Sequence, residues 1–326
     1  MSETAGEHAL MPRKVEFAVW LPQAGLEPAA LIERAALAEK LGYHSFWIAD
    51  HMWTPDLPEI GFSECLALLS AIAARTERIR IGTLVICNSF RNPALLAKSL
   101  TTIDWISNGR LEAGLGAGWA EEEYRAYGYE FPSMAARLRQ LEEGLQILKL
   151  MFTKERVNFR GRHYTVANAV NNPKPVQKPH PPITLGGSGE KVMLRLVAQY
   201  ADRWNCPRGD YLKIDAKLAA LRKHCLEVGR DFATITVSEQ VVICIGSDRD
   251  QVESGWHALE AQWKGSPEHQ QFLSTAIKGT PPEVIARLRE RVAKGITLFT
   301  ILFSDFTALG MMELFAREVM PAFALG

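Results

Sequence analysis

The sequence predicts an α/β fold: a (β/α)8 TIM barrel with insertions, formed by one domain over residues 1–326. Eight short runs rich in β-branched and aromatic residues alternate with stretches of helical periodicity, and eight is the strand number of this barrel. The length agrees, because such barrels take about 250 residues and often carry insertions. We expect insertions at about 153–182 and 247–281.

The first unit shows the pattern, because the run VEFAVW (15–20) precedes PAALIERAALAEKLG, whose leucines and alanines recur on one helical face. Farther along the chain, Asn92 and Pro93 predict a helix start, and Asn108 with Gly109 predicts its end. The eight predicted strands are residues 15–20, 45–50, 79–87, 110–116, 182–187, 202–206, 235–244 and 297–303.

A doubly wound open sheet also alternates strands with helices and is the alternative fold. Its usual glycine fingerprint is missing after the first strand, where LPQAGLEP holds one glycine. The two expected insertions belong to neither minimal fold. The first contains a possible hairpin, VNFRGRHYTV, turning at Gly161, followed by a proline-rich run, and loops of this length are usually lids or binding loops.

Composition excludes several classes of protein. Lys plus Arg and Asp plus Glu both number 37, without long blocks of like charge, so a nucleic-acid partner is not expected. The N-terminus lacks the apolar region of a signal peptide, and no apolar stretch reaches about 18 residues, which predicts a cytoplasmic protein without a membrane partner. The five scattered cysteines predict buried thiols, not disulfides or zinc: Cys65, Cys87, Cys206, Cys225 and Cys244.

Active sites of such barrels lie at the C-terminal ends of the strands. The second predicted strand ends in Asp50 and His51, a pair able to accept, donate and shuttle protons. A structural role is the alternative, since a histidine there can hydrogen-bond a loop and an aspartate can cap one. The fourth strand ends in GLGAGWAEEEY, whose alternate glycines indicate either close packing or a backbone surface for a ligand.

The stretch ITLGGSGEK (183–191) places glycines directly after the fifth predicted strand. The backbone N–H groups of Gly186, Gly187, Ser188 and Gly189 could approach an oxyanion at a helix start, with a tight turn as the alternative. Other sites are not encoded: the sequence contains no G-x-S-x-G, no GxxxxGK[ST] and no HExxH, and we predict no metal.

Taken together, these stretches resemble the luciferase-like flavin or deazaflavin oxidoreductases, a family of (β/α)8 barrels. The resemblance rests on IADH, on IGTLVICNSFRNPALLAKSLTTIDWISNGRLEAGLGAGW, and on NNPKPVQKPHPPITLGGSGEK followed by YADRWN, and it spans nearly the whole chain. It is greatest to the branch that uses coenzyme F420. The resemblance implies a small organic substrate, a homodimer, and a non-prolyl cis peptide around residues 84–87.

By that resemblance, His51 transfers a proton or polarises the substrate, and Asp50 fixes the substrate. Gly186, Gly187 and Ser188, with Asn205, would hold the cofactor phosphate. The implied cofactor contacts are Asp50, Val85, Ile86, Cys87, Ala117, Gly118, Gly186, Gly187, Ser188 and Asn205.

The chain departs from the sugar-phosphate and alcohol dehydrogenases of the F420 branch at Trp119, where those enzymes carry a proton-donating glutamate. Their substrate class therefore does not carry over. One alternative function keeps the fold and uses FMN as a monooxygenase supplied by a partner reductase. Another is a non-catalytic barrel that binds a flavin.

Overall fold

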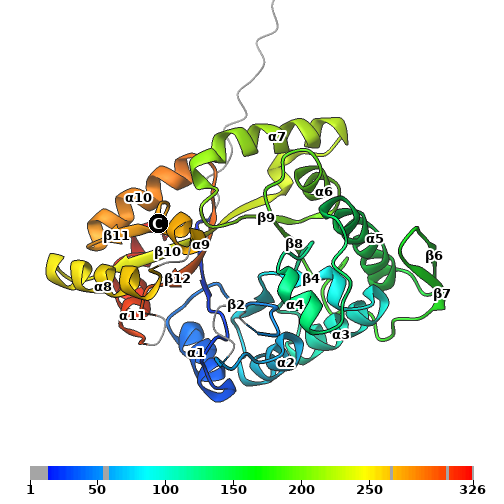
Figure 1. Cartoon of the computed structure of the whole chain (residues 1–326), viewed down its shortest axis with the longest axis horizontal. Helices are drawn as coiled ribbons and strands as arrows, with labels where there is room; N and C mark the ends of the chain where they lie inside the picture. Colours follow the sequence, from blue (N-terminus) through cyan, green and yellow to red (C-terminus); the bar gives the residue numbers. More distant parts are fainter. Residues whose placement is uncertain (1–13, 54–58, 265–266, 306–307, 325–326) are drawn as a thin grey trace, which may run out of the picture.

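The computed structural model describes residues 14–53, 59–264, 267–305 and 308–324. It confirms the (β/α)8 barrel, because eight parallel strands close on themselves through the pairings of β10 with both β9 and β12. Helices surround the strands (Figure 1). The strands are β1 (Glu16–Trp20), β2 (Ser45–Ile48), β3 (Arg80–Thr83) with β4 (Ile86–Cys87), β5 (Leu111–Gly116), β8 (Ile183–Gly186), β9 (Arg203–Cys206), β10 (Thr236–Ile245) and β12 (Leu298–Phe303).

All eight predicted strands are present, and their ends differ from the prediction by no more than a few residues. One difference is in the third, which is interrupted between β3 and β4. The peptide bond Leu84–Val85, in this interruption, is cis, as the resemblance implied. The helices are α1 (Pro28–Lys40), α2 (Cys65–Arg75), α3 (Pro93–Ile106), α4 (Glu121–Ala126), α5 (Met134–Thr153), α6 (Met193–Tyr200), α7 (Ile214–Glu227), α8 (Arg249–Gln262), α9 (Pro267–Leu273), α10 (Pro281–Ala293) and α11 (Gly310–Glu318).

Local signals explain where α3 begins and ends. The Asn92 side chain accepts hydrogen bonds from Ala94 N at 2.9 Å and Leu95 N at 3.3 Å, so it caps the helix as predicted. After the helix, Asn108 and Gly109 both take positive φ, at 52° and 82°. Such left-handed residues end helices, and the sequence signal is confirmed.

Glycines bring the strands close together inside the barrel. A β-carbon at Gly82 would lie 2.6 Å from the Trp47 ring, and one at Gly114 would lie 1.8 Å from the carbonyl oxygen of Thr83. No side chain can be added at either position without displacing a neighbour. The predicted close packing of the glycines in the fourth predicted strand, β5, is therefore confirmed for Gly114.

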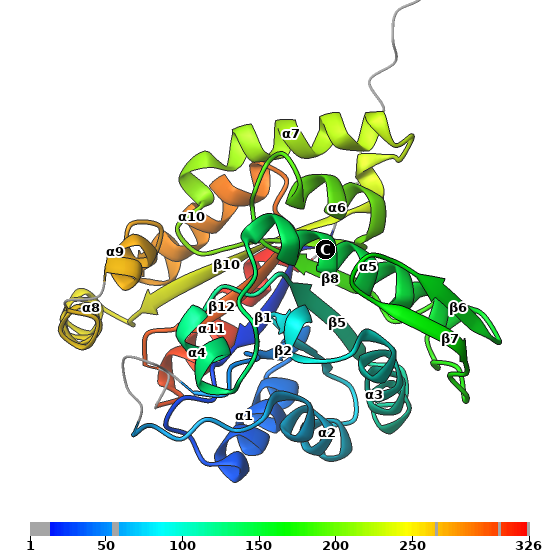
Figure 2. The same ribbon diagram turned by 45° about the vertical axis from the view of Figure 1, so that its right-hand side comes forward.

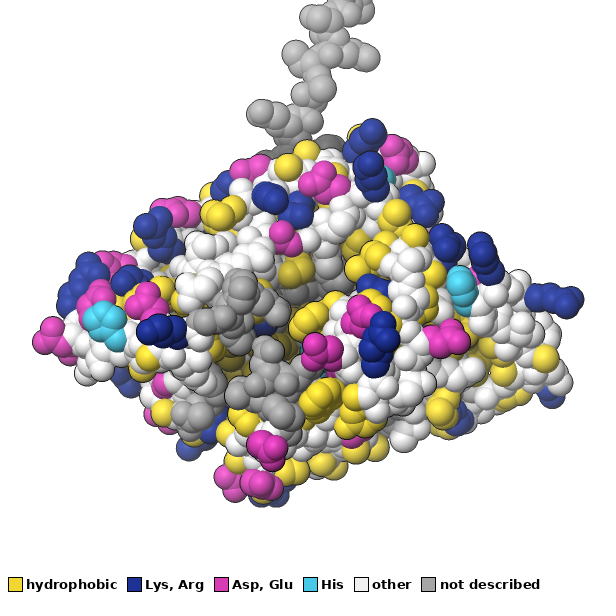
Figure 3. Space-filling view, viewed as in Figure 1, with side chains coloured by type: hydrophobic (Ala, Val, Ile, Leu, Met, Phe, Trp, Pro, Cys, Tyr) yellow, Lys and Arg dark blue, Asp and Glu magenta, His cyan; other side chains and the backbone are white. Residues whose placement is uncertain are grey.

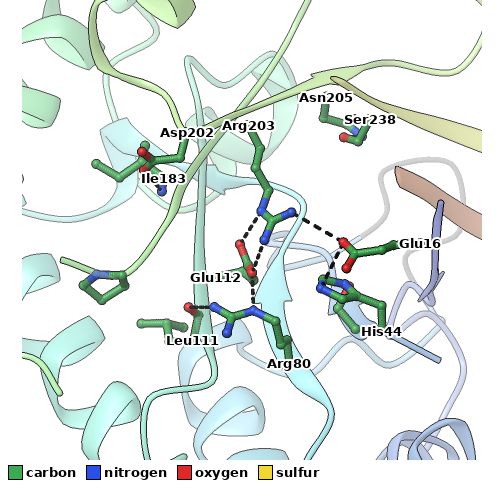
Figure 4. A network of polar contacts seen from close by, with 12 residues as sticks. Glu16, His44, Arg80, Leu111, Glu112, Ile183, Asp202, Arg203, Asn205 and Ser238 are labelled. Carbon is green, nitrogen blue, oxygen red and sulfur yellow. Dashed lines mark hydrogen bonds and ion pairs between the residues drawn. The ribbon is translucent and has the colours of Figure 1, made fainter. Parts of the chain in front are cut away.

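A polar network fills the opposite, N-terminal end of the barrel (Figure 4). Glu112 is fully buried, and both Arg80 and Arg203 donate to its carboxylate. Burial lowers the pKa of neighbouring His44 to about 4 and raises that of Glu16, so their 3.2 Å contact is a hydrogen bond and not an ion pair at neutral pH. The charges pair within the barrel and leave the other end for ligands.

The first expected insertion contains the predicted hairpin, confirmed as β6 (Val157–Arg160) and β7 (Thr165–Ala169), antiparallel to each other. It projects from the side of the barrel beside α5 (Figure 2). The range 247–281 holds α8, α9 and β11 (Ile277–Gly279), and β11 pairs with β10. Residues 265–266, within this range, lie outside the described residues, as does the N-terminal stretch 1–13.

The five cysteines are free and buried, as predicted. Within the part of the chain that the structure describes, no helix is both long and apolar enough to cross a bilayer. Over the same residues, no cluster of three His, Cys, Asp or Glu side chains is placed to hold a metal ion.

Candidate active site

The C-terminal ends of neighbouring barrel strands bring the predicted site residues together. Strand β4 pairs with β5, with Cys87 opposite Gly116, and β5 pairs with β8, with Leu115 opposite Leu185. The segments that follow β2, β4, β5 and β8 therefore meet at one end of the barrel, which we call the mouth. On the face shown in Figure 3, hydrophobic side chains gather around the middle, where α4 and α9 lie in Figure 1.

Asp50 lies at the mouth but is fully engaged by protein groups. Its Oδ2 accepts hydrogen bonds from Cys87 N at 2.9 Å and Arg91 Nη1 at 2.6 Å, and its Oδ1 accepts from Arg91 Nη2 at 2.8 Å. Burial alone would lower the pKa of Arg91, but the hydrogen bonds to Asp50 and Glu64 raise it above its ordinary value. Asp50 thus holds the chain after β4 in place, and the sequence gave no sign of its partner Arg91.

His51 is the predicted site residue best placed for proton transfer. Its Nδ1 lies 3.0 Å from Oε2 of Glu123, on α4, and the other oxygen of Glu123 accepts from Met52 N. The edges of Trp119 and Phe62 meet the imidazole, with ring centroids 5.6 and 6.0 Å from it. The His51 side chain is 27% exposed, so it remains accessible from the mouth.

Val85 forms a bulge seated on glycines from two strands. A β-carbon at Gly116 would lie 2.6 Å from Val85 Cγ2, and one at Gly186 would lie 2.8 Å from Val85 Cγ1. The neighbouring Ile86 side chain is fully buried in the main core, so only its backbone can face a ligand. The absence of side chains at both glycines makes room for the bulge.

Gly118 fits where no other residue does. Its φ is +77°, and a β-carbon there would lie 2.0 Å from Tyr124 Oη and 2.6 Å from Cys87 Sγ. These two atoms are themselves in contact at 2.9 Å. Burial raises the pKa of the Cys87 thiol to about 11, so Cys87 is a packing residue and not a nucleophile. Ala117, next to Gly118, is half-buried.

The turn after β8 has the donors that an oxyanion requires. Among the described residues, the N–H groups of Ser188 and Gly189 have no acceptor, whereas Gly187 N donates to Asn205 O at 3.4 Å. The Ser188 hydroxyl is occupied, because it donates to Asp210. The ammonium of buried Lys217 lies 3.1 Å from Ser188 O and 3.7 Å from Asp210 Oδ1.

These groups fit a phosphate at the turn: two free N–H donors accompany a buried cation that already balances Asp210. The helix contributes less than the sequence indicated. Helix α6 begins at Met193 and not near Glu190, because residues 190–192 form a turn first. Lys217 and Asp210 belong to segments after β9, and the sequence offered no link between them and the glycines.

Asn205 joins the turn through its backbone only. Its side-chain amide donates to Ser238 Oγ at 2.9 Å and Thr300 Oγ1 at 3.3 Å, inside the barrel. The amide therefore stabilises the contact between β9, β10 and β12, and lies away from the N–H groups of the turn.

Comparison with known proteins gives a consistent family. Residues 14–298 match the family model for luciferase-like monooxygenases. The chain is 28% identical over 316 residues to an F420-dependent glucose-6-phosphate dehydrogenase of Segniliparus rotundus, covering 90% of this chain and 93% of that protein. It is 26% identical over 352 residues to the FMNH(2)-dependent dimethylsulfone monooxygenase of Pseudomonas putida, covering 95% and 96%.

The fold is similar to that of a solved F420-dependent secondary alcohol dehydrogenase in complex with an F420-acetone adduct. The TM-score is 0.81 with 20% sequence identity, over 96% of this chain and 100% of that one. At this identity the similarity establishes the barrel fold and nothing finer.

The contact of Gly118 with Tyr124 and Cys87 gives a testable prediction. Gly118→Ala should lower the free energy of unfolding by about 2–4 kcal/mol, from the left-handed backbone and the steric overlap. Adding Tyr124→Phe should restore part of the loss, because it removes the oxygen 2.0 Å from the new methyl group. Thermal denaturation of the three variants measures both effects; a Gly118→Ala protein as stable as wild type would contradict the packing described.

Proposed function

The chain belongs to the luciferase-like monooxygenase family, and on that premise we propose that it is an oxidoreductase that transfers a hydride between bound coenzyme F420 and a small organic substrate. The observation that carries the proposal is His51, held through Nδ1 by buried Glu123 at the same end of the barrel as the 186–189 turn. A proton-transfer group and an oxyanion receptor at one mouth are what such a reaction needs. Most of the relatives compared are F420-dependent dehydrogenases, which supports this cofactor.

The chain's own residues divide the work. The N–H groups of Ser188 and Gly189, with Lys217 nearby, would hold the cofactor phosphate. Val85, on its glycine seat, would support the ring. His51 Nε2 would exchange a proton with the substrate. When bound, the deazaflavin supplies or accepts the hydride.

Substrate identity is narrowed by one side chain. Trp119 is 60% exposed beside His51, where the resemblance placed a proton-donating glutamate in sugar-phosphate and alcohol dehydrogenases. An indole offers a flat apolar surface and no exchangeable acid. We therefore propose that the substrate is not a sugar phosphate, and that activated double bonds and imines are the first compounds to screen.

The alternative is an FMN-dependent monooxygenase that receives reduced flavin from a partner reductase. The similarity to the FMNH(2)-dependent monooxygenase over 95% of the chain favours it, and the turn at 186–189 would serve either phosphate. A non-catalytic flavin-binding barrel has less support, because it leaves the His51–Glu123 pair without a purpose.

The cofactor is tested by titrating the purified, cofactor-free protein with F420 and with FMN, following absorbance and fluorescence side by side. We expect F420 to bind more tightly than FMN. A preference for FMN, with oxygen consumption when reduced FMN is supplied, would replace the proposal by the monooxygenase. Binding of neither would mean that the 186–189 turn has only a structural role.

His51 is tested by replacement. His51→Ala should lower turnover about 10²–10⁴-fold, the range that a positioned acid or base contributes, while cofactor affinity changes by no more than a few fold. Steady-state kinetics and the same titration separate the two effects. Unchanged turnover would rule out His51 as the proton-transfer group.

We also propose that the protein is a homodimer through α2 and α3, in line with the resemblance. Leu95, Trp105 and Ile106 are large exposed hydrophobic side chains on α3, which packs against α2. Sedimentation velocity should show a dimer that Leu95→Glu dissociates, and a monomeric wild type would refute the proposal. The cytoplasmic location and the absence of a nucleic-acid partner stay predictions.

A further inference from the structure

Glu123 differs from its two neighbours on α4. Glu121 and Glu122 are exposed, as expected for acidic residues in the first turn of a helix, whereas Glu123 is 1% exposed. A buried carboxylate is costly unless its oxygens accept hydrogen bonds. Both oxygens do so here: Oε1 accepts from Met52 N and Oε2 lies 3.0 Å from His51 Nδ1.

These contacts determine the protonation pattern of the imidazole. Met52 N–H can only donate, and a carboxylate that accepts it presents a second acceptor oxygen to Nδ1. The proton of a neutral His51 must therefore lie on Nδ1, which leaves the lone pair on Nε2. Among the described residues, Nε2 has no partner.

The imidazole is also held from its sides. Trp119 and Phe62 meet it edge-to-face, with interplanar angles of 75° and 81°. Together with Glu123 they fix the ring orientation and leave the Nε2 edge as the part that a substrate can approach.

We propose that Glu123 is a positioning residue for the reaction: it fixes His51 as the Nδ1–H tautomer and presents Nε2 to the substrate. This inference rests on the proposed function. In the oxidation direction, the substrate C–H bond breaks and its hydrogen leaves with the electron pair as hydride to the deazaflavin. The proton of the adjacent O–H or N–H goes to Nε2 as the C=O or C=N bond forms. Glu123 then stabilises the imidazolium, and reduction is the reverse.

A conservative replacement distinguishes this role from simple packing. Glu123→Gln keeps the size and can still accept from Met52 N through its carbonyl oxygen, but it then turns its NH₂ group toward Nδ1. His51 should switch to the Nε2–H tautomer while the fold is retained. The matched control is Glu122→Gln, the same chemical change one residue earlier on the exposed face of α4.

The direct measurement is a two-bond ¹H–¹⁵N correlation spectrum of cofactor-free protein labelled at histidine, with the His51 signal assigned by its loss in His51→Gln. We expect Nδ1–H in wild type and in Glu122→Gln, and Nε2–H in Glu123→Gln. Turnover should fall by about 10²-fold or more in Glu123→Gln alone, since the equivalent change in a Ser-His-Asp triad costs roughly 10⁴-fold. Cofactor affinity and thermal midpoint should stay near wild type.

Two results would overturn the proposal: an Nε2–H tautomer in the wild-type protein, or a Glu123→Gln variant that switches tautomer and keeps full turnover. Failure of the proposed function looks different. In that case wild type binds neither cofactor, and the tautomer spectrum, which needs no cofactor, still decides whether Glu123 sets the state of His51.

Discussion

The site depends on the absence of side chains where β5 passes the break between β3 and β4. A β-carbon at Gly114 would lie 1.8 Å from the carbonyl oxygen of Thr83, and β-carbons at Gly116 and Gly186 would overlap Val85. These positions admit no side chain, so the backbone of one strand can lie against the bulge of the next. Because the bulge sits there, Cys87 N comes within 2.9 Å of Asp50 and the ends of β2 and β4 are joined.

The rest of the mouth is built outward from that joint. The chain continues from Asp50 directly into His51, and α4 returns Glu123 to it from the segment that follows β5. Charge is handled locally at both ends of the barrel. Glu112 is matched by two arginines at the N-terminal end, and Asp50 by Arg91 at the mouth. Among these groups, His51 is the titratable side chain whose second nitrogen faces the mouth without a described partner.

The sequence predicted the fold well, because strand and helix periodicities are local and the eight apolar runs are clearly separated. The helix cap at Asn92 and the hairpin turning at Gly161 followed from local signals for the same reason. The site was predicted in part. Its residues follow strand ends, which a barrel always gathers at one face. Arg91, Glu123 and Lys217 escaped notice because their roles come from contacts across 41, 72 and 29 residues of chain. The glycines were ambiguous, since close packing and ligand approach require the same residue.

The central claim is that the mouth between Val85 and the 186–189 turn binds the cofactor. The most direct test is a crystal structure of the protein with F420 bound. The account predicts the phosphate within hydrogen-bond distance of the N–H groups of Ser188 and Gly189, and the ring against Val85 within reach of His51 Nε2. A phosphate bound instead at the loops after β10 and β12, the commoner location in such barrels, would contradict it.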